Sequence, residues 1–194
     1  MIPYVTTSSE PAVLLLRELL GPELAGRIRW IDGEGWHGAV GMADSRISNE
    51  AAVALVLGPS KKSGTNAREQ DKATIYRGLH AVHAGSRFRV FLLRTAPEGL
   101  LFRSPELLRQ LVGREPSPEQ LARARKQPGK VLAELLDVKP ESLAGALRPR
   151  LETVDLTPLR SIQSIRRLRS FMRTCVRRYE ATLARRLEHS SKTV

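Results

Sequence analysis

The chain has 194 residues, 41% of them hydrophobic, so it can bury a core of ordinary domain size and disorder is not its default state. Its formal net charge is +12, and its one cysteine, Cys175, excludes an internal disulfide and a cysteine-based zinc cluster. The start of the chain lacks a basic segment followed by a long apolar run, and apolar stretches reach only about six residues. We therefore expect a cytoplasmic protein without a signal peptide or a transmembrane segment.

The positive charge is concentrated toward the C-terminus. Residues 148–194 carry twelve basic and four acidic side chains, a net of +8. A basic surface attracts polyanions by neutralising phosphates and releasing their counterions. The charge therefore favours nucleic acid as the partner. An anionic membrane, an acidic protein or a merely solvated surface are the alternatives.

The first hundred residues alternate between short apolar runs and amphipathic helical segments. Strands are predicted at residues 2–5, 27–31, 52–57 and 87–93, and helices at 10–20, 36–48 and 67–84. Residues 6–9 are expected to form a polar turn after the first strand. The run from Ala52 to Leu57 is apolar on both faces, which is typical of a central parallel strand. This order predicts an α/β fold with a Rossmann-like, mainly parallel sheet and helices on both faces.

Beyond residue 93 the pattern becomes helical. Short helices are predicted at residues 104–112, 118–126, 129–137 and 140–147, followed by a proline-containing connector and a long helix at 161–188. Apolar residues of the long helix recur every three or four positions and form one stripe. We divide the chain into an α/β domain (1–100), a helical extension (101–147) and a basic C-terminal segment with the long amphipathic helix (148–194).

Several runs together resemble the TOPRIM fold, and more narrowly the TOPRIM-like proteins of the overcoming-lysogenization-defect nuclease group. These runs are Val53–Leu57, Glu69-Gln70, Phe88–Leu92, Glu98–Phe102 and Ser104–Leu108, within a resemblance that covers residues 2–136. The resemblance implies a bacterial setting of DNA repair or defence against phage. It also implies a glutamate after the first strand and two aspartates after the third, which hold Mg²⁺ for phosphodiester chemistry.

The carboxylates that the resemblance implies are missing from this chain. Thr6 or Thr7 stands at the first position, and Gly58 and Ser60 stand at the other two. Neutral hydroxyls and a glycine bind Mg²⁺ too weakly to hold it, so we expect no metal cofactor. The resemblance then implies a catalytically degenerate protein, not an enzyme, that binds nucleic acid or scaffolds a nucleic-acid-processing complex.

Other acidic residues keep an enzymatic alternative open. Glu10, Asp32 and Glu34 lie near the ends of the first two strands, and residues that follow parallel strands share one edge of the sheet. A site rebuilt from these acids would make the protein an active Mg²⁺-dependent nuclease. The simpler interpretation is that Glu10 is a first-turn helix acid and that Asp32 and Glu34 belong to a turn.

The predicted nucleic-acid-binding residues are basic side chains in one loop and on the last helix. They are Lys61, Lys62, Arg166, Arg169, Arg173 and Arg177. The three-four spacing of the arginines places them on one helix face, which we expect opposite the apolar stripe. Such a face contacts the phosphate backbone of duplex DNA with little sequence preference. The same helix could instead lie on an anionic membrane or dock on a partner subunit, which would make the protein an interaction subunit without nucleic-acid contact.

Overall fold

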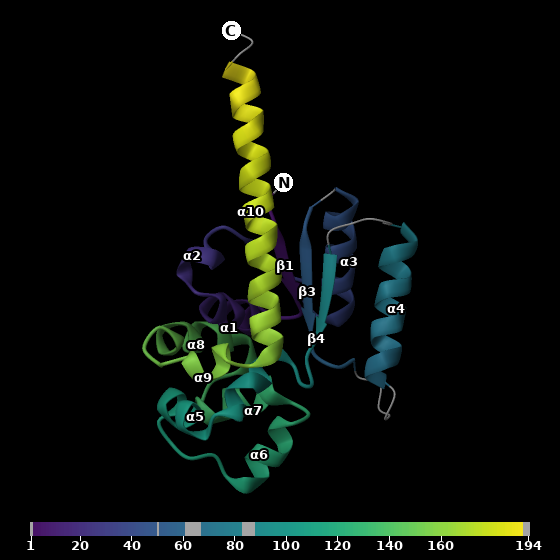
Figure 1. Ribbon diagram of the computed structural model, residues 1–194. Coiled ribbons are helices and arrows are strands. Elements are labelled where there is room, and N and C mark those ends of the chain that lie inside the picture. Colours follow the sequence, from purple (N-terminus) through teal and green to yellow (C-terminus); the bar gives the residue numbers. More distant parts are fainter. Residues whose placement is uncertain (1, 50, 61–66, 83–87, 192–194) are drawn as a thin grey trace.

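The computed structural model describes residues 2–49, 51–60, 67–82 and 88–191, and it contains a four-stranded, entirely parallel sheet (Figure 1). The strands are β1 (Tyr4–Thr7), β2 (Arg29–Asp32), β3 (Val53–Leu57) and β4 (Phe88–Leu92), in the spatial order β2-β1-β3-β4. The α/β fold predicted from the sequence is therefore confirmed. Two of the predicted strands begin two residues too early, and for β1 this difference changes the position of two candidate site residues.

Alternate residues of β3 face two different layers of helices. Val53, Leu55 and Leu57 pack in one cluster with α3 (Trp36–Ser48) and α4 (Ala67–Val82). Ala54 and Val56 pack in the other cluster, with α1 (Glu10–Leu20) and α10 (Gln163–Ser191). Every residue of β3 is buried, as the run of apolar residues predicted for a central strand. The last helix, far away in the sequence, thus completes one face of the sheet.

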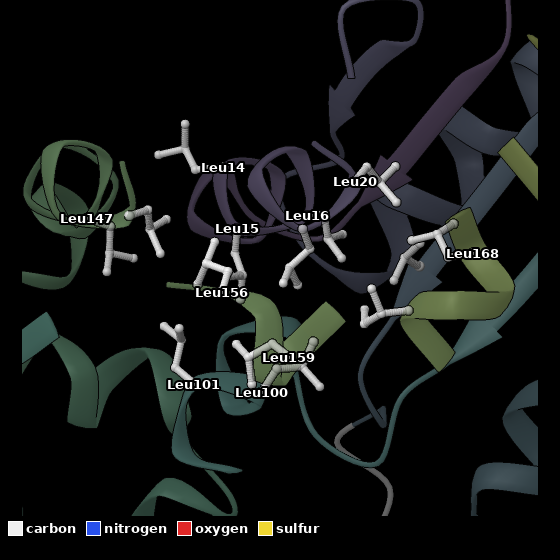
Figure 2. Packing of buried hydrophobic residues seen from close by; sticks show 14 of the residues in the cluster. Leu14, Leu15, Leu16, Leu20, Leu100, Leu101, Leu147, Leu156, Leu159 and Leu168 are labelled. Atoms are coloured by element: carbon white, nitrogen blue, oxygen red, sulfur yellow. The ribbon is translucent and has the colours of Figure 1, made fainter. Parts of the chain in front are cut away.

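Short helices fill the space beyond the carboxyl ends of the strands (Figure 1). They are the 3₁₀ helices η1 (Pro97–Arg103) and η2 (Pro140–Ser142), α5 (Pro105–Val112), α6 (Pro118–Ala124), α7 (Pro128–Leu135), α8 (Leu143–Leu151) and α9 (Thr157–Arg160). A further short helix, α2 (Pro22–Ala25), follows α1 and lies apart from this group. Leucines from η1, α8 and α9 converge on the leucines of α1, as Figure 2 shows. One hydrophobic cluster therefore contains residues from all three segments into which the sequence was divided.

The helix α10 is unevenly buried along its length. Ile165, Leu168, Met172 and Val176 each expose 3% or less of their surface, because they pack against α1 and the sheet. Residues 180–189 are all exposed, and this end of the helix extends past the rest of the molecule (Figure 1). Within the described ranges, no helix combines the length and the apolar character needed to cross a membrane.

Candidate functional site

The carboxyl edge of the sheet brings together the positions that the sequence singled out. Thr7 pairs with Asp32 in register, and Gly58 and Ser60 follow the neighbouring strand β3. The sequence predicted a turn at Thr6 and Thr7, but they are the last two residues of β1. Threonine is β-branched and suits a pleated strand, so the strand extends through both residues. Both side chains are fully buried, and their hydroxyl oxygens have no hydrogen-bond partner in the described structure.

The two positions after β3 are occupied in ways that leave little room for a carboxylate. A Cβ atom built on Gly58 would lie 2.6 Å from the Cα of Ala96, because the segment after β4 passes directly over this glycine. Ser60 donates its backbone N–H and its hydroxyl to the two carboxylate oxygens of Asp71, at 3.0 and 2.8 Å. Asp71 is 6% exposed, so these bonds satisfy a buried acid of α4.

A buried glutamate, Glu98 of η1, lies at the same edge. It is 5% exposed and accepts a hydrogen bond of 2.5 Å from the hydroxyl of Ser9, which also caps α1 by accepting from the Ala12 N–H. Burial raises the pKa of Glu98, the bond from Ser9 opposes that rise, and the negative charge of Asp32 adds to it. Asp32 therefore lies within electrostatic reach of Glu98, an acid that is not among the three of the enzymatic alternative.

The three acids of the enzymatic alternative lie in different surroundings. Glu10 is exposed in the first turn of α1, and Glu34 is exposed at a positive φ of 52°. Asp32 accepts the backbone N–H of Glu34 at 2.8 Å, as expected for an acid in a turn. Within the described ranges, no group of three or more His, Cys, Asp or Glu side chains could hold a metal ion.

Glu98 gives a test of the electrostatics at this edge. Its pKa is raised above 4.5 in the folded chain, so the unfolded chain loses this proton first as the pH rises, and the free energy of unfolding falls between the two pKa values. Glu98→Gln removes that penalty while keeping an acceptor for Ser9. We expect the stability of the variant relative to wild type to increase from about pH 4 to neutrality, measured by urea unfolding at each pH. Glu115→Gln, at an exposed loop position, is the control; a parallel pH trend in both variants would contradict the role of burial.

A second site, which we call the arginine groove, lies between α10 and the end of α1. Its volume is about 640 Å³, and it is lined by Leu20, Gly21, Pro22, Glu23, Leu24, Arg27, Arg160, Arg169, Arg173, Val176 and Arg177. Together α1 and α2 connect the carboxyl end of β1 with the amino end of β2, and the groove lining includes none of the residues described above at the carboxyl edge. The groove and the carboxyl edge are therefore separate sites.

Three of the four predicted arginines of α10 line this groove. Arg169 is half-buried, whereas Arg173 and Arg177 are exposed. At about 100° per residue, Arg169 lies beside the buried stripe at Val176, which lines the same groove, and Arg173 and Arg177 lie progressively farther round the helix. The row of arginines therefore begins next to the stripe and does not stand wholly opposite it as expected. Arg166 is exposed outside the groove lining. Lys61 and Lys62 lie outside the described residues.

Two arginines that the sequence did not indicate complete the groove. Arg160, at the end of α9, is held by a hydrogen bond of 3.0 Å from its Nη2 to the carbonyl oxygen of Glu18. Arg27, after α2, pairs with Glu180 of α10 at 3.0 Å and with Glu23 at 3.8 Å. The Nε atoms of Arg160 and Arg169 are buried and have no hydrogen-bond partner in the described structure. Five guanidinium groups thus line the groove, and the carboxylates of Glu23 and Glu180 pair with one of them, that of Arg27.

Comparisons of the chain with protein-family models, with curated proteins and with solved structures gave no match. What this chain binds must therefore be inferred from the geometry of these two sites.

Proposed function

We propose that this protein binds nucleic acid through its phosphate backbone, at the arginine groove. The observation that carries the proposal is the convergence of Arg27, Arg160, Arg169, Arg173 and Arg177 from three separate parts of the chain. A guanidinium group stays charged and offers several donors in a planar fork that matches phosphate oxygens. Such contacts position the backbone and carry no base sequence, so duplex DNA is bound with little sequence preference.

We further propose that the α/β part is a TOPRIM-like domain whose catalytic carboxylates have been replaced. Supporting observations are the parallel sheet and the surroundings of the four residues that are candidates for the three replaced positions. Thr6 and Thr7 are buried within β1, Gly58 lies against Ala96, and Ser60 is bonded to Asp71. The protein then acts as a binding or scaffolding component of a DNA-repair or phage-defence complex. The metal-dependent nuclease remains the enzymatic alternative.

The salt dependence of duplex binding tests the groove. Each neutralised phosphate contributes about 0.9 to the slope of log affinity against log salt on B-DNA. Four arginines in contact, with Arg27 held by its carboxylates, give a slope of about −3.6. We expect the double variant Arg173→Gln, Arg177→Gln to reduce the slope to about −1.8, measured by fluorescence anisotropy on a labelled duplex.

The matched control for this titration is Arg167→Gln with Arg178→Gln. These two arginines are exposed on α10 but outside the groove lining, and the double variant removes the same charge. Its slope should equal that of wild type. Equal slopes for all three proteins would assign the binding to the general charge of the chain and contradict a groove-based interface.

A cleavage assay tests the degenerate carboxyl edge. We expect no cutting of DNA or RNA by the purified protein with Mg²⁺ or Mn²⁺. Hydrolysis of a phosphodiester requires a bound metal to stabilise the developing charge, and the carboxylates that would hold this metal are missing. Calorimetry with Mn²⁺ should likewise detect no binding at this edge. Metal-dependent cleavage that is lost in Asp32→Ala or Glu34→Ala would overturn the proposal in favour of the nuclease.

A further inference from the structure

The arginine groove has an inner and an outer part. Arg160 and Arg169 are half-buried, and the Nε atom of each is buried without a hydrogen-bond partner in the described structure. Arg173 and Arg177 are exposed farther along α10. A buried N–H donor left unpaired is energetically costly, so the inner pair, Arg160 and Arg169, is suited to bind an anion. The exposed pair can attract any phosphate, whereas the inner pair requires a group that enters the groove.

The far side of the groove is spanned by an ion pair. Arg27 lines the groove after α2 and reaches Glu180, three residues beyond Arg177 on α10, at 3.0 Å. This contact joins the two walls past the last groove arginine. A volume of about 640 Å³ also falls within the range of pockets for single small ligands. The shape therefore suits a group at the end of a strand better than a strand that passes through.

The number of donors indicates which phosphate fits. A phosphodiester inside a strand carries one negative charge on two free oxygens. A terminal phosphate monoester has three free oxygens and a charge of about −1.5 to −2, so it can pair with several guanidinium groups at once. We propose that the groove is a binding site for a phosphate monoester, with Arg160 and Arg169 as its inner ligands and the 5′-phosphate of a DNA end as the source. This inference rests on the proposed function, because it names the part of the nucleic acid that the groove selects.

The test compares two duplexes that differ only at their ends. The same blunt, internally labelled duplex is prepared with 5′-phosphate or with 5′-hydroxyl ends, and anisotropy is measured at one fixed salt concentration. We expect the phosphorylated duplex to bind about tenfold more tightly, the effect of one charge-assisted hydrogen-bond set. Arg169→Gln should remove this preference while retaining weaker binding to the hydroxyl-ended duplex. Arg173→Gln, at the exposed part, should weaken both duplexes and keep the preference.

Arg160→Gln removes the bond to Glu18 and can disturb the fold, so Arg169→Lys is the second variant. It retains the charge but loses the planar fork of donors, and it should reduce the preference for the phosphorylated duplex with an unchanged far-ultraviolet circular dichroism spectrum.

Deoxyadenosine 5′-monophosphate and inorganic phosphate are added as competitors. Displacement only at concentrations far above that of the duplex ends supports the strand end as the source. Displacement at concentrations comparable to the ends would overturn that source and assign the site to a free phosphate.

Failure of the monoester site and failure of the proposed function give different results in this test. Equal affinity for both duplexes, with the salt slope still dependent on the groove arginines, would overturn the monoester site and leave the proposed function intact. Absence of binding to either duplex at low salt would contradict both the monoester site and the proposed function.

Discussion

Replacing Leu168 with alanine is expected to lower the free energy of unfolding by about 2–5 kcal/mol. Leu168 is 1% exposed and lies where α10 meets the leucines of α1 (Figure 2). Truncating it removes buried methyl groups and leaves a cavity that the neighbouring side chains fill only partly. The loss is a large fraction of the roughly 5–15 kcal/mol that stabilises an ordinary domain. Urea unfolding followed by circular dichroism measures it.

The same helix supplies a control of the same residue type. Leu183 is 43% exposed on the part of α10 that extends past the rest of the molecule, so Leu183→Ala should change the free energy of unfolding by less than about 0.5 kcal/mol. A small loss in both variants would mean that α10 does not contribute to the core. An equally large loss at Leu183 would mean that the end of the helix is packed in solution.

The elements of the fold could be predicted because their signals are local. The apolar run of β3 indicated a central parallel strand, and the amphipathic pattern at residues 10–20 predicted α1. The position of α10 could not be predicted in this way. Its apolar stripe shows that one face is buried, but not that it covers the sheet beside α1, since that depends on contacts between distant segments.

The end of β1 shows the limit of reading polar residues as turns. Thr6 and Thr7 are polar, yet their backbone groups extend the ladder with β2 before the chain turns at Ser8. Sequence alone could not show that their hydroxyls would be buried. Their burial is a tertiary effect, because the surrounding helices cover this edge of the sheet.

The candidate site was predictable in part for the same reason. The three-four spacing along one helix placed Arg169, Arg173 and Arg177 together. Arg27 and Arg160 come from other segments and carry no local pattern that links them to α10. Glu98 was visible as an acid, but its contact with Ser9 depends on the packing of η1 beneath α1.

Reversing the charge of two groove residues is expected to have the largest effect on binding. Arg169→Glu with Arg173→Glu removes two donors and places two negative charges in the groove. Hydrogen bonds to charged groups contribute about 1.5–3 kcal/mol each, so duplex affinity at low salt should fall at least about a hundredfold. Anisotropy measures the affinity, and circular dichroism verifies that the glutamate at the half-buried position 169 leaves the helical content unchanged.

The control is Arg167→Glu with Arg178→Glu, which changes the net charge by the same amount at exposed positions of α10 outside the groove. Long-range attraction depends on total charge and is screened by salt, so it weakens equally in both double variants. Direct contacts depend on position, so only the groove variant should lose the additional affinity. Equal losses would show that the arginines act through total charge alone. If wild type itself does not bind duplex at low salt, the groove serves an acidic protein or an anionic membrane, and the interaction-subunit alternative replaces the nucleic-acid proposal.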